Sequence, residues 1–261
     1  MPELIEVEMY RRLADRVVGR TVESVEAPDD WFVKGTTPGH VRDAVEGALI
    51  HGTDRLGKLM TVDLGPDRPV LGLRFGMTGR LVLDGEDVPI EKLEYASGRD
   101  DPRWDRFALV FDGGARMRIS DPRRLGGVEL DPDLARLGPE ASTLTTPQLR
   151  AATSGSTAPL KARLLDQSRV AGLGNLLTDE TLWRAAMRPD RSANDLTDPE
   201  LRRLARSVRE TVALLFDRGG SHTGDLQSQR TRHGRCPRDG TELRRDTIGG
   251  RTTYWCPSHQ R

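Results

Sequence analysis

The pattern of apolar residues changes once along this 261-residue chain, and the change separates segments that must fold differently. Residues 21–131 contain short β-rich runs separated by Gly, Pro and Asp, which is typical of an antiparallel sandwich or barrel. From about Thr145 the apolar residues follow a helical period through four segments, and Gly219–Gly220 closes the last one. We therefore predict a multidomain α+β protein with boundaries at 1–131, 132–220 and 221–261.

Composition narrows the class of protein. Charged residues make up 31% and hydrophobic residues 36%, and the net charge is zero, which argues against a uniformly basic nucleic-acid-binding protein. The charge is uneven, however, because residues 151–261 contain 19 Lys/Arg against 13 Asp/Glu. The C-terminal part is therefore basic and the N-terminal part acidic.

We looked next for segments that would span a membrane or direct export. No apolar run reaches the length of a transmembrane segment, and the acidic N-terminal stretch differs from a signal peptide. We expect a cytoplasmic protein with no membrane partner. The polar stretch 86–106 is expected to form a mobile loop between strands.

The basic C-terminal segment contains both cysteines of the chain. Cys236, Asp239, Cys256 and His259 form two short knuckles separated by a segment of hairpin length, which is the arrangement of a zinc ribbon. His233 competes with Asp239 for the fourth ligand position, but Gly240 after Asp239 suits a tight knuckle turn. A disulfide or a metal-free hairpin are the alternatives, and a cytosolic location disfavours the disulfide. We predict one structural zinc ion.

The N-terminal stretch MPELIEVE has two interpretations. Pro2 suits the first position of a helix, and Glu3 and Glu6 complement the positive end of the helix dipole. Methionine before proline is normally removed, however, and the exposed secondary amine among carboxylates is a potential covalent catalyst. The stretch alone favours the helix start.

A second motif, GLGN at 172–175, lies between two predicted helices. It fails as a dinucleotide fingerprint because no strand precedes it and the third glycine is absent. Its backbone N–H groups and the following helix N-terminus could hold a phosphate, or the motif could be a simple helix connector.

Four separated motifs occur in a fixed order before the ribbon, and together they are far more specific than any one alone. They are MPELIEVE, FGMTGRL at 75–81, DPRRLGG at 121–127 and LLDQSRVAGLGNLLTDETLW. In this order the chain resembles the formamidopyrimidine-DNA glycosylase and endonuclease VIII family of base-excision-repair enzymes. The resemblance covers nearly the whole chain. It implies an N-terminal helix and β-sandwich, a helix–two-turn–helix domain, and a zinc finger.

The resemblance also implies the catalytic roles. Pro2 matches the nucleophile, whose amine attacks C1′ and forms a Schiff base before strand cleavage by β/δ-elimination. Glu3 matches the general acid, and Glu6 matches a supporting carboxylate. Lys58 matches the lysine that holds a phosphate beside the lesion. The expected partner is damaged double-stranded DNA, bound by a monomer in the nucleoid.

The remaining matches concern DNA contacts. Asn175 and Arg251 correspond to the pair that grips phosphates flanking the flipped nucleotide, and Lys161 belongs to the same DNA-binding set. Met77 and Arg124 resemble residues inserted into the gap that base flipping leaves.

Several departures from the family pattern bear on the substrate. Ile5, Arg74 and Leu125 stand where a second proline, a histidine and an aromatic wedge are common. The connector between the last helix and the ribbon is far shorter than in the 8-oxoguanine enzymes, which grip the flipped purine with that loop. The resemblance therefore implies an endonuclease VIII-like preference for oxidised pyrimidines, or chiefly abasic sites.

Two other functions remain open from the sequence. A non-catalytic or abasic-site-restricted paralogue would recognise damaged DNA with the same fold, and the altered zinc ligands and Leu125 are compatible with it. An unrelated zinc-ribbon nucleic-acid module would explain the C-terminal segment but not the N-terminal motif.

Overall fold

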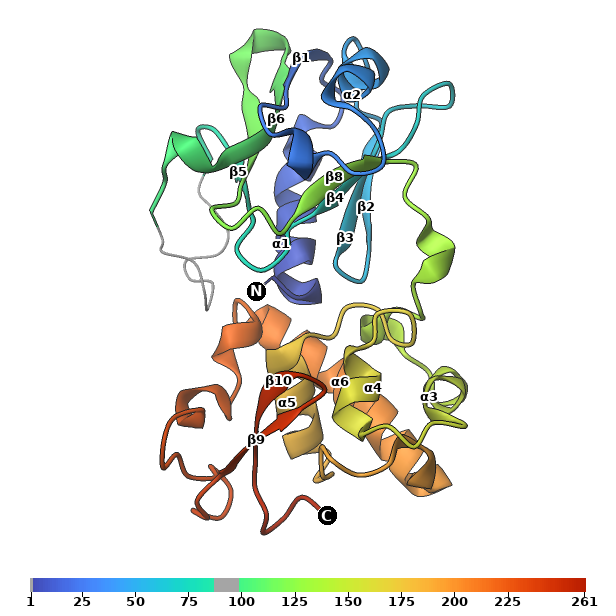
Figure 1. Ribbon diagram of the computed structural model, residues 1–261, viewed down its shortest axis with the longest axis vertical. Helices are drawn as coiled ribbons and strands as arrows, with labels where there is room; N and C mark the ends of the chain where they lie inside the picture. The colour runs from blue at the N-terminus through green and yellow to red at the C-terminus, as the bar shows by residue number, and fades with distance from the viewer. Residues whose placement is uncertain (1, 87–98) are drawn as a thin grey trace. The chain divides into compact units, whose positions relative to one another are not determined.

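The computed structural model describes residues 2–86 and 99–261, which form two compact units that divide after Leu134 (Figure 1). Most of the expected loop at 86–106 therefore lies outside the described residues, while a 3-10 turn covers Pro102–Trp104. The α-helices of the described residues are α1 Leu4–Ala14, α2 Pro38–Val45, α3 Thr146–Thr153, α4 Leu160–Leu165, α5 Asn175–Arg184 and α6 Asp198–Asp217.

The N-terminal unit contains two four-stranded antiparallel sheets, with strand orders β1-β6-β7-β5 and β2-β3-β4-β8. The predicted antiparallel sandwich is confirmed. The strands are β1 Val22–Glu26, β2 Gly52–Leu56, β3 Leu59–Asp63, β4 Leu71–Arg74, β5 Arg80–Leu83, β6 Asp105–Phe111, β7 Arg116–Ser120 and β8 Gly127–Leu130.

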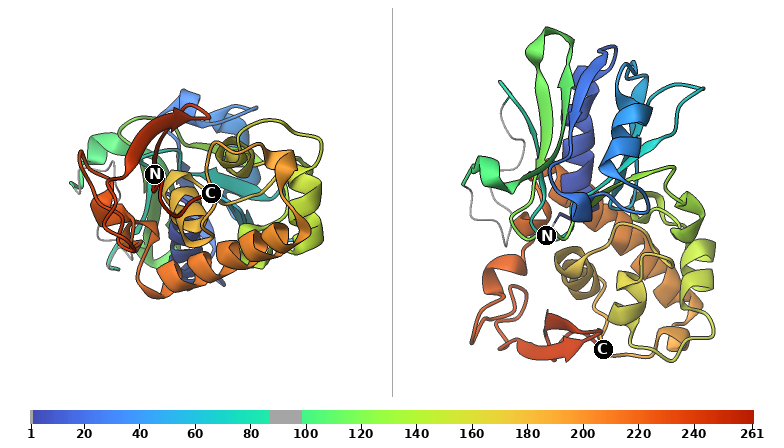
Figure 2. Two further views of the ribbon diagram at one scale, coloured as in Figure 1. Left: turned by 90° about the horizontal axis from the view of Figure 1, so that it is seen from below. Right: turned by 45° about the horizontal axis from the view of Figure 1, so that its top comes forward.

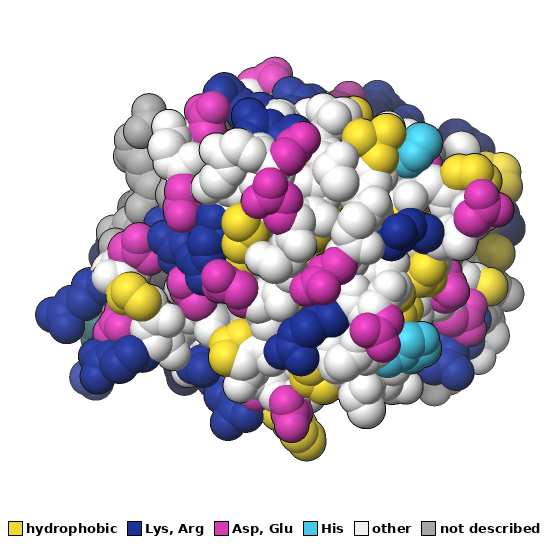
Figure 3. All heavy atoms as spheres, turned by 90° about the horizontal axis from the view of Figure 1, so that it is seen from above, with side chains coloured by type: hydrophobic (Ala, Val, Ile, Leu, Met, Phe, Trp, Pro, Cys, Tyr) yellow, Lys and Arg dark blue, Asp and Glu magenta, His cyan; other side chains and the backbone are white. Residues whose placement is uncertain are grey.

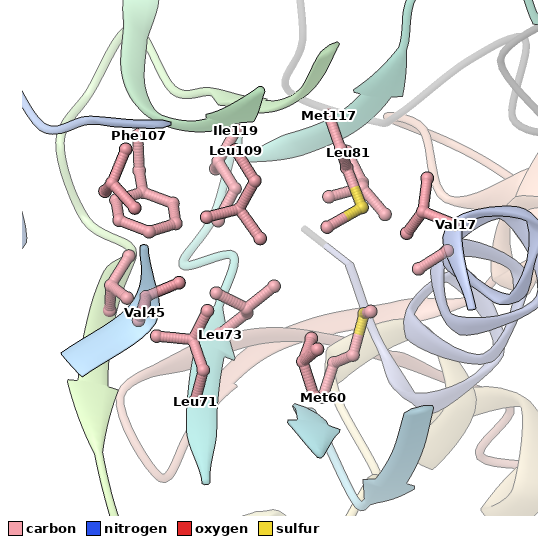
Figure 4. Close-up of a cluster of buried hydrophobic side chains, with 14 of the residues drawn as sticks. Val17, Val45, Met60, Leu71, Leu73, Leu81, Phe107, Leu109, Met117 and Ile119 are labelled. Carbon is pink, nitrogen blue, oxygen red and sulfur yellow. The ribbon is translucent and has the colours of Figure 1, made fainter. Parts of the chain in front are cut away.

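Apolar side chains from the two sheets meet in one core (Figure 4). Phe107 and Leu109 of β6 face this core from one sheet, and Leu71 and Leu73 of β4 face it from the other. Helix α1 contacts β2 and β3 of one sheet and β5 of the other. Because α1 packs against both sheets, the sandwich fixes its position and also the position of the residues at its N-terminus.

The C-terminal unit combines helices α3–α6 with a two-stranded hairpin of β9 Arg244–Ile248 and β10 Arg251–Trp255 (Figure 2). Helix α5 contacts α4, α6 and β10, so the predicted helical and ribbon segments share one unit. Trp183 of α5 packs with Leu226 and both cysteines in a small buried cluster. The four helices predicted after Thr145 are confirmed.

The helices and the surface charge bear on where such a chain can bind. Among the described residues, no helix is both long and apolar enough to cross a bilayer. Basic and acidic side chains are interspersed on the face shown in Figure 3. That face therefore differs from a surface made up mainly of basic side chains.

The start of α6 carries a charge that links stability to pH. Glu200 completes a capping box with Thr197, and its carboxylate accepts two hydrogen bonds from Arg191 at 2.5 and 3.0 Å. Hydrogen bonding by Arg191 is the largest influence on the pKa of Glu200, and it lowers that pKa. Partial burial opposes this effect and hydrogen bonds from Thr197 add to it, so the pKa falls from 4.5 to about 2. The ion pair therefore stabilises the fold fully above pH 4.5 and is lost as the pH falls toward 2.

We predict that Glu200→Gln lowers the free energy of unfolding by up to about 1 kcal/mol at pH 7, because glutamine keeps the cap but loses the ion pair. Urea unfolding at several pH values measures this difference. It should shrink as the pH falls from 5 toward 2, because the carboxylate is protonated first in the unfolded chain, near pH 4.5, and only near pH 2 in the folded protein. Glu23→Gln, on the exposed face of β1, is the control. A constant difference at all pH values would contradict the assignment.

Candidate active site and metal centre

The N-terminus of α1 places two carboxylates behind Pro2. Glu3 is the N-cap residue, and it forms a capping box with Glu6 in which each side chain accepts a hydrogen bond from the other's backbone N–H. The Glu3 N–H donates to Glu6 Oε2 at 2.8 Å. Glu3 and Glu6 are each only 1% exposed, and Pro2 is buried. The predicted catalytic residues Pro2, Glu3 and Glu6 therefore also form the N-terminal end of helix α1.

Tyr10 connects α1 to the loop after β4. Its ring lies 4.7 Å from the ring of Phe75, and its hydroxyl donates to the carbonyl oxygen of Gly79 at 3.4 Å. Complete burial, together with the negative charge of Glu6, raises the pKa of Tyr10 far above its usual value. The hydroxyl therefore stays protonated and remains a donor, which holds the 75–79 loop against α1.

Asp121 organises two neighbouring loops that carry Met77 and Arg124. Its buried carboxylate accepts hydrogen bonds from the Thr78 hydroxyl at 2.5 Å and from the backbone N–H groups of Leu125 and Gly126 at 2.8 and 2.9 Å. These contacts join the 75–79 loop to the 121–126 loop. Met77 and Arg124 consequently belong to one loop pair of the N-terminal unit.

The two loops approach each other at Gly76. Its φ is +58°, and a Cβ atom there would lie 2.4 Å from the carbonyl carbon of Leu125. A side chain at this position is therefore excluded by both backbone conformation and space. Leu125 itself is half exposed.

Arg124 has a partner that sequence reasoning missed. With φ at +56°, its guanidinium donates two hydrogen bonds to Asp29, from Nε at 2.6 Å and from Nη2 at 2.5 Å. Hydrogen bonding by Arg124 outweighs burial and lowers the pKa of Asp29. The two residues are far apart in sequence and lie in unrelated motifs, so no local signal could have joined them.

Lys58 lies in the turn of the β2–β3 hairpin, half buried, beside Gly57 at φ +59°. Arg55 supports this turn, because its Nη1 donates to the Gly57 carbonyl at 2.8 Å and its Nε donates to Glu8 on α1 at 3.3 Å. Burial alone would raise the pKa of Glu8. Hydrogen bonds from Arg11, Arg12 and Arg55 have a larger effect in the opposite direction and lower the pKa to about 2. The ionised Glu8 thus ties the lysine-bearing hairpin to α1.

In the C-terminal unit, Gln167 shapes the GLGN turn. Its amide nitrogen donates to the carbonyl of Leu173 at 2.9 Å, and its amide oxygen accepts from the Gly172 N–H at 3.0 Å. Gly172 has φ +107°, a conformation that L side chains rarely adopt. Asn175 follows as the first residue of α5, and its buried Oδ1 has no hydrogen-bond partner in the described part of the chain.

Arg251 lies at the tip of the ribbon hairpin and is exposed. Gly249 and Gly250, at φ +59° and +72°, form the turn, and a Cβ at Gly249 would lie 2.9 Å from Ala162 of α4. The tip therefore rests directly on α4, which fixes where Arg251 begins β10.

Helix α5 and strand β10 run in the same direction. The Tyr254 N–H donates to Asp179 at 3.2 Å, and farther along α5 the Trp183 carbonyl lies 3.2 Å from His259, which follows the end of β10. Asn175 and Arg251, which begin α5 and β10, consequently lie at the same end of this unit. The proposed phosphate-gripping role of these two residues stays a prediction.

Lys161 has a position unlike that of a surface phosphate contact. Its side chain is 0% exposed, and its Nζ lies 2.6 Å from Asp179 Oδ1 and donates to Thr253 Oγ1 at 2.7 Å. The ammonium group is directed at buried partners on α5 and β10. Lys161 joins the helices to the ribbon here rather than presenting a charge to the surface.

Four side chains of the ribbon come together as the sequence predicted. The possible ligand atoms of Cys236, Asp239, Cys256 and His259 all lie within 4.8 Å of one another, so these residues could hold a metal ion. Cys236 and Cys256 are buried and are not joined by a disulfide. Two sulfurs, an imidazole and a carboxylate are a donor set that tetrahedral zinc accepts.

Hydrogen bonds around this cluster orient its members. His259 Nε2 lies 3.2 Å from the Trp183 carbonyl, while its Nδ1 lies 3.3 Å from Asp239 and 3.5 Å from the Cys236 sulfur. Donation from Nε2 to a carbonyl leaves Nδ1 as the lone-pair nitrogen that a metal needs. His233 lies outside the cluster, because its side chain is 70% exposed and bonded to Glu242.

Two known families match consecutive parts of the chain. Residues 1–128 match the formamidopyrimidine-DNA glycosylase N-terminal domain, and residues 137–225 match the formamidopyrimidine-DNA glycosylase H2TH domain. The formamidopyrimidine-DNA glycosylase of Symbiobacterium thermophilum is 34% identical over 285 residues, covering 100% of this chain and 89% of that protein. The Paracoccus denitrificans enzyme is 36% identical over 284 residues, covering 98% and 99%. Both alignments are longer than this chain, so the relatives contain residues that it lacks.

Solved structures agree with this assignment. A Lactococcus lactis Fpg complex with DNA containing FAPY-dG has a TM-score of 0.84 and 29% identity, covering 99% of this chain and 100% of the other. A complex of the same enzyme with DNA containing an abasic site gives 0.84 and 28%, with complete coverage of both chains. The predicted fold and family are confirmed, and this chain belongs to the formamidopyrimidine-DNA glycosylase family of DNA-repair enzymes.

Proposed function

We propose that this protein is a base-excision-repair DNA glycosylase with abasic-site lyase activity, acting as a monomer on damaged double-stranded DNA in the bacterial nucleoid. The observation that carries the proposal is the buried Glu3–Glu6 capping box directly behind Pro2 at the start of α1. Membership of a glycosylase family and the intact Pro2, Glu3 and Lys58 favour the enzyme over a non-catalytic paralogue.

The proposed chemistry begins with removal of Met1, which gives Pro2 a secondary amine. The amine nitrogen bonds to C1′ of the damaged nucleotide, and the C1′–base bond breaks with its electron pair leaving on the base. Opening of the sugar ring then gives a cationic iminium between Pro2 and the sugar. This iminium withdraws electrons from the sugar. A proton acceptor can therefore remove a C2′ proton, and the 3′ phosphate is expelled.

Glu3 and Glu6 have different proposed tasks. Glu3 supplies the proton to the sugar ring oxygen or the departing base, and it later accepts protons during elimination. Glu6 accepts the Glu3 N–H at 2.8 Å and so fixes the backbone that carries Pro2 and Glu3. Its negative charge also favours the cationic iminium.

We assign DNA positioning to the Lys58 turn of the N-terminal unit and to the residues that begin α5 and β10 in the C-terminal unit. Lys58, on its supported turn, would hold a phosphate beside the lesion. The Asn175 amide group and the Arg251 guanidinium would donate to the phosphates flanking the flipped nucleotide. Met77 and Arg124, on paired loops, would fill the gap in the duplex. Lys161 would act indirectly, by holding β10 in place beneath Arg251.

The connector between α6 and the ribbon supports the proposed lesion preference. Asp225 and Leu226 donate backbone N–H groups to Glu180 at 3.2 and 2.9 Å, and Arg230 forms an ion pair with Asp179. Leu226 is 1% exposed. Because the connector is short and fastened to α5, it has little length to surround a flipped purine. We therefore propose oxidised pyrimidines and abasic sites as the main substrates.

The proposed cofactor is one structural zinc ion on Cys236, Asp239, Cys256 and His259. The ion would close the two knuckles and so order the hairpin that presents Arg251. It would supply no chemistry to the reaction, because all four ligands come from the protein and leave no open position.

Covalent trapping tests the nucleophile. We predict that borohydride reduces the iminium and links the wild-type protein to DNA containing an abasic site, and that Pro2→Gly reduces trapping by at least tenfold. Mass spectrometry should show a mature chain beginning at Pro2. Protein that retains Met1 and traps equally well would show that another residue is the nucleophile. Glu3→Gln should impair excision of an intact base more than cleavage of a preformed abasic site.

A substrate panel tests the lesion preference. Single-turnover rates on matched duplexes should be at least tenfold higher for an oxidised pyrimidine than for 8-oxoguanine, because the connector offers no loop for the purine. Cleavage of an abasic duplex in the same series reports on lyase competence. Faster excision of 8-oxoguanine would overturn the preference while leaving the glycosylase assignment intact. Cleavage of the abasic duplex alone would support the abasic-restricted alternative.

Metal analysis tests the ribbon. Purified protein should carry about one zinc per chain, and Cys256→Ser should lose it because serine cannot replace a thiolate ligand. Asp239→Ala should weaken zinc retention against a chelator, whereas the matched variant His233→Ala should retain the metal, since His233 lies outside the cluster. The opposite result for the pair would make His233 the ligand.

A further inference from the structure

The C-terminal unit contains a basic cavity that the proposed repair chemistry does not use. Its volume is about 340 Å³, and it lies between the C-terminal end of α5, one face of α6 and the first metal knuckle. The charged and hydroxyl side chains that the argument uses are Arg184, Arg203, Arg206, Arg238, Glu210 and Thr211. Arg184 pairs with Glu180 and Asp225, so the net positive charge of the wall comes from the other three guanidinium groups, against the single carboxylate of Glu210.

Three of these arginines have no carboxylate partner among the described residues. Arg203 Nε donates to the Ala185 carbonyl at 3.0 Å, and Arg238 Nη2 donates to the Arg184 carbonyl at 3.2 Å. Arg206 is exposed and makes no hydrogen bond or ion pair within the described parts of the chain. These three guanidinium groups outnumber the single Glu210 carboxylate of the wall, so an anion bound among them would reduce their mutual repulsion.

Thr211 provides an independent sign of a ligand. Its side chain lines the cavity and is 0% exposed, yet its Oγ1 has no hydrogen-bond partner in the part of the chain that the structure describes. Buried hydroxyl groups are normally satisfied, so the Thr211 hydroxyl calls for a partner, which a ligand or a water molecule in this cavity would supply. The neighbouring Ser207 differs, because its hydroxyl already donates to the Thr181 carbonyl at 3.0 Å.

We propose that this cavity binds a phosphate monoester. Arginine forks match the oxygen geometry of phosphate, and a group carrying about two negative charges suits a wall with an excess of guanidinium groups better than a single carboxylate does. The Thr211 hydroxyl supplies a neutral donor to the same group. The volume lies near the lower limit of small-ligand pockets and suits one nucleotide-sized molecule.

The cavity is separate from the expected phosphate contacts. It adjoins Arg184 at the last turn of α5, whereas Asn175 begins that helix, and ten helical residues span about 15 Å. The phosphate monoester could belong to a free nucleotide or to the end of a DNA strand. The site therefore does not depend on the proposed chemistry at Pro2.

Calorimetric titration of full-length, zinc-loaded protein with adenosine 5′-monophosphate tests the site. We expect saturable binding that Arg206→Gln weakens at least tenfold. Arg202→Gln removes the same charge from the same helix but from outside the cavity, and it should bind as wild type does. Loss of binding in both variants, or in neither, would overturn the proposal. So would loss in Lys58→Gln or Arg251→Gln, because the probe would then occupy the DNA-contacting residues.

A second variant separates a ligand contact from a structural role. Thr211→Val removes the unpartnered hydroxyl and keeps the shape of the side chain, so the protein should be at least as stable as wild type. Its affinity for the nucleotide should nevertheless fall several-fold. Unchanged affinity with unchanged stability would exclude Thr211 from the site.

Lesion-free duplexes with and without a 5′-phosphate distinguish the two sources. Tighter binding of the phosphorylated duplex, abolished by Arg206→Gln, would assign the site to DNA ends. Equal binding of both duplexes, together with Arg206-dependent nucleotide binding, would assign it to free nucleotides. Excision rates of Arg206→Gln on damaged DNA should match wild type, so failure of this site and failure of the repair proposal give different results.

Discussion

The carboxylate of Asp179 holds the C-terminal unit together. It receives Lys161 from α4, Arg230 from the connector and the Tyr254 N–H from β10, and it is 2% exposed. Two cations and a backbone donor compensate the cost of burying this charge. Removing one partner of such a buried group typically costs about 3–5 kcal/mol, because the remaining charge is then unpaired. The position of β10, which begins at Arg251, therefore depends on a residue that is itself buried.

A buried aspartate has a similar role in the N-terminal unit. Asp121 accepts hydrogen bonds from Thr78 in one loop and from Leu125 and Gly126 in the other, so two loops behave as one support. The metal cluster adds a third anchor, at the far end of α5. At Asp121 and Asp179, a carboxylate buried among donors fixes the neighbouring segments. This arrangement places rigid supports beneath the residues that we propose contact DNA.

Sequence reasoning succeeded where a function requires consecutive residues. The helix start at Glu3 and Glu6, the glycine turn before Asn175 and the two metal knuckles are each set by a few neighbouring residues, and local rules describe them. It could not place Lys161, because burial of a lysine depends on Asp179 and Thr253, which other motifs supply. The pairing of Arg124 with Asp29 was missed for the same reason.

The zero net charge is compatible with a phosphate-binding surface because many charges are used internally. Arg118 pairs with Asp84, Asp100 and Asp105, and hydrogen bonding to Asp100 first raises its pKa against the effect of burial. Such arginines add to the sequence total but present little field to a ligand. Arg251, by contrast, is exposed and has no ion pair within the described residues. The distribution of unpaired cations, rather than the sum of all charges, therefore determines where a polyanion can bind.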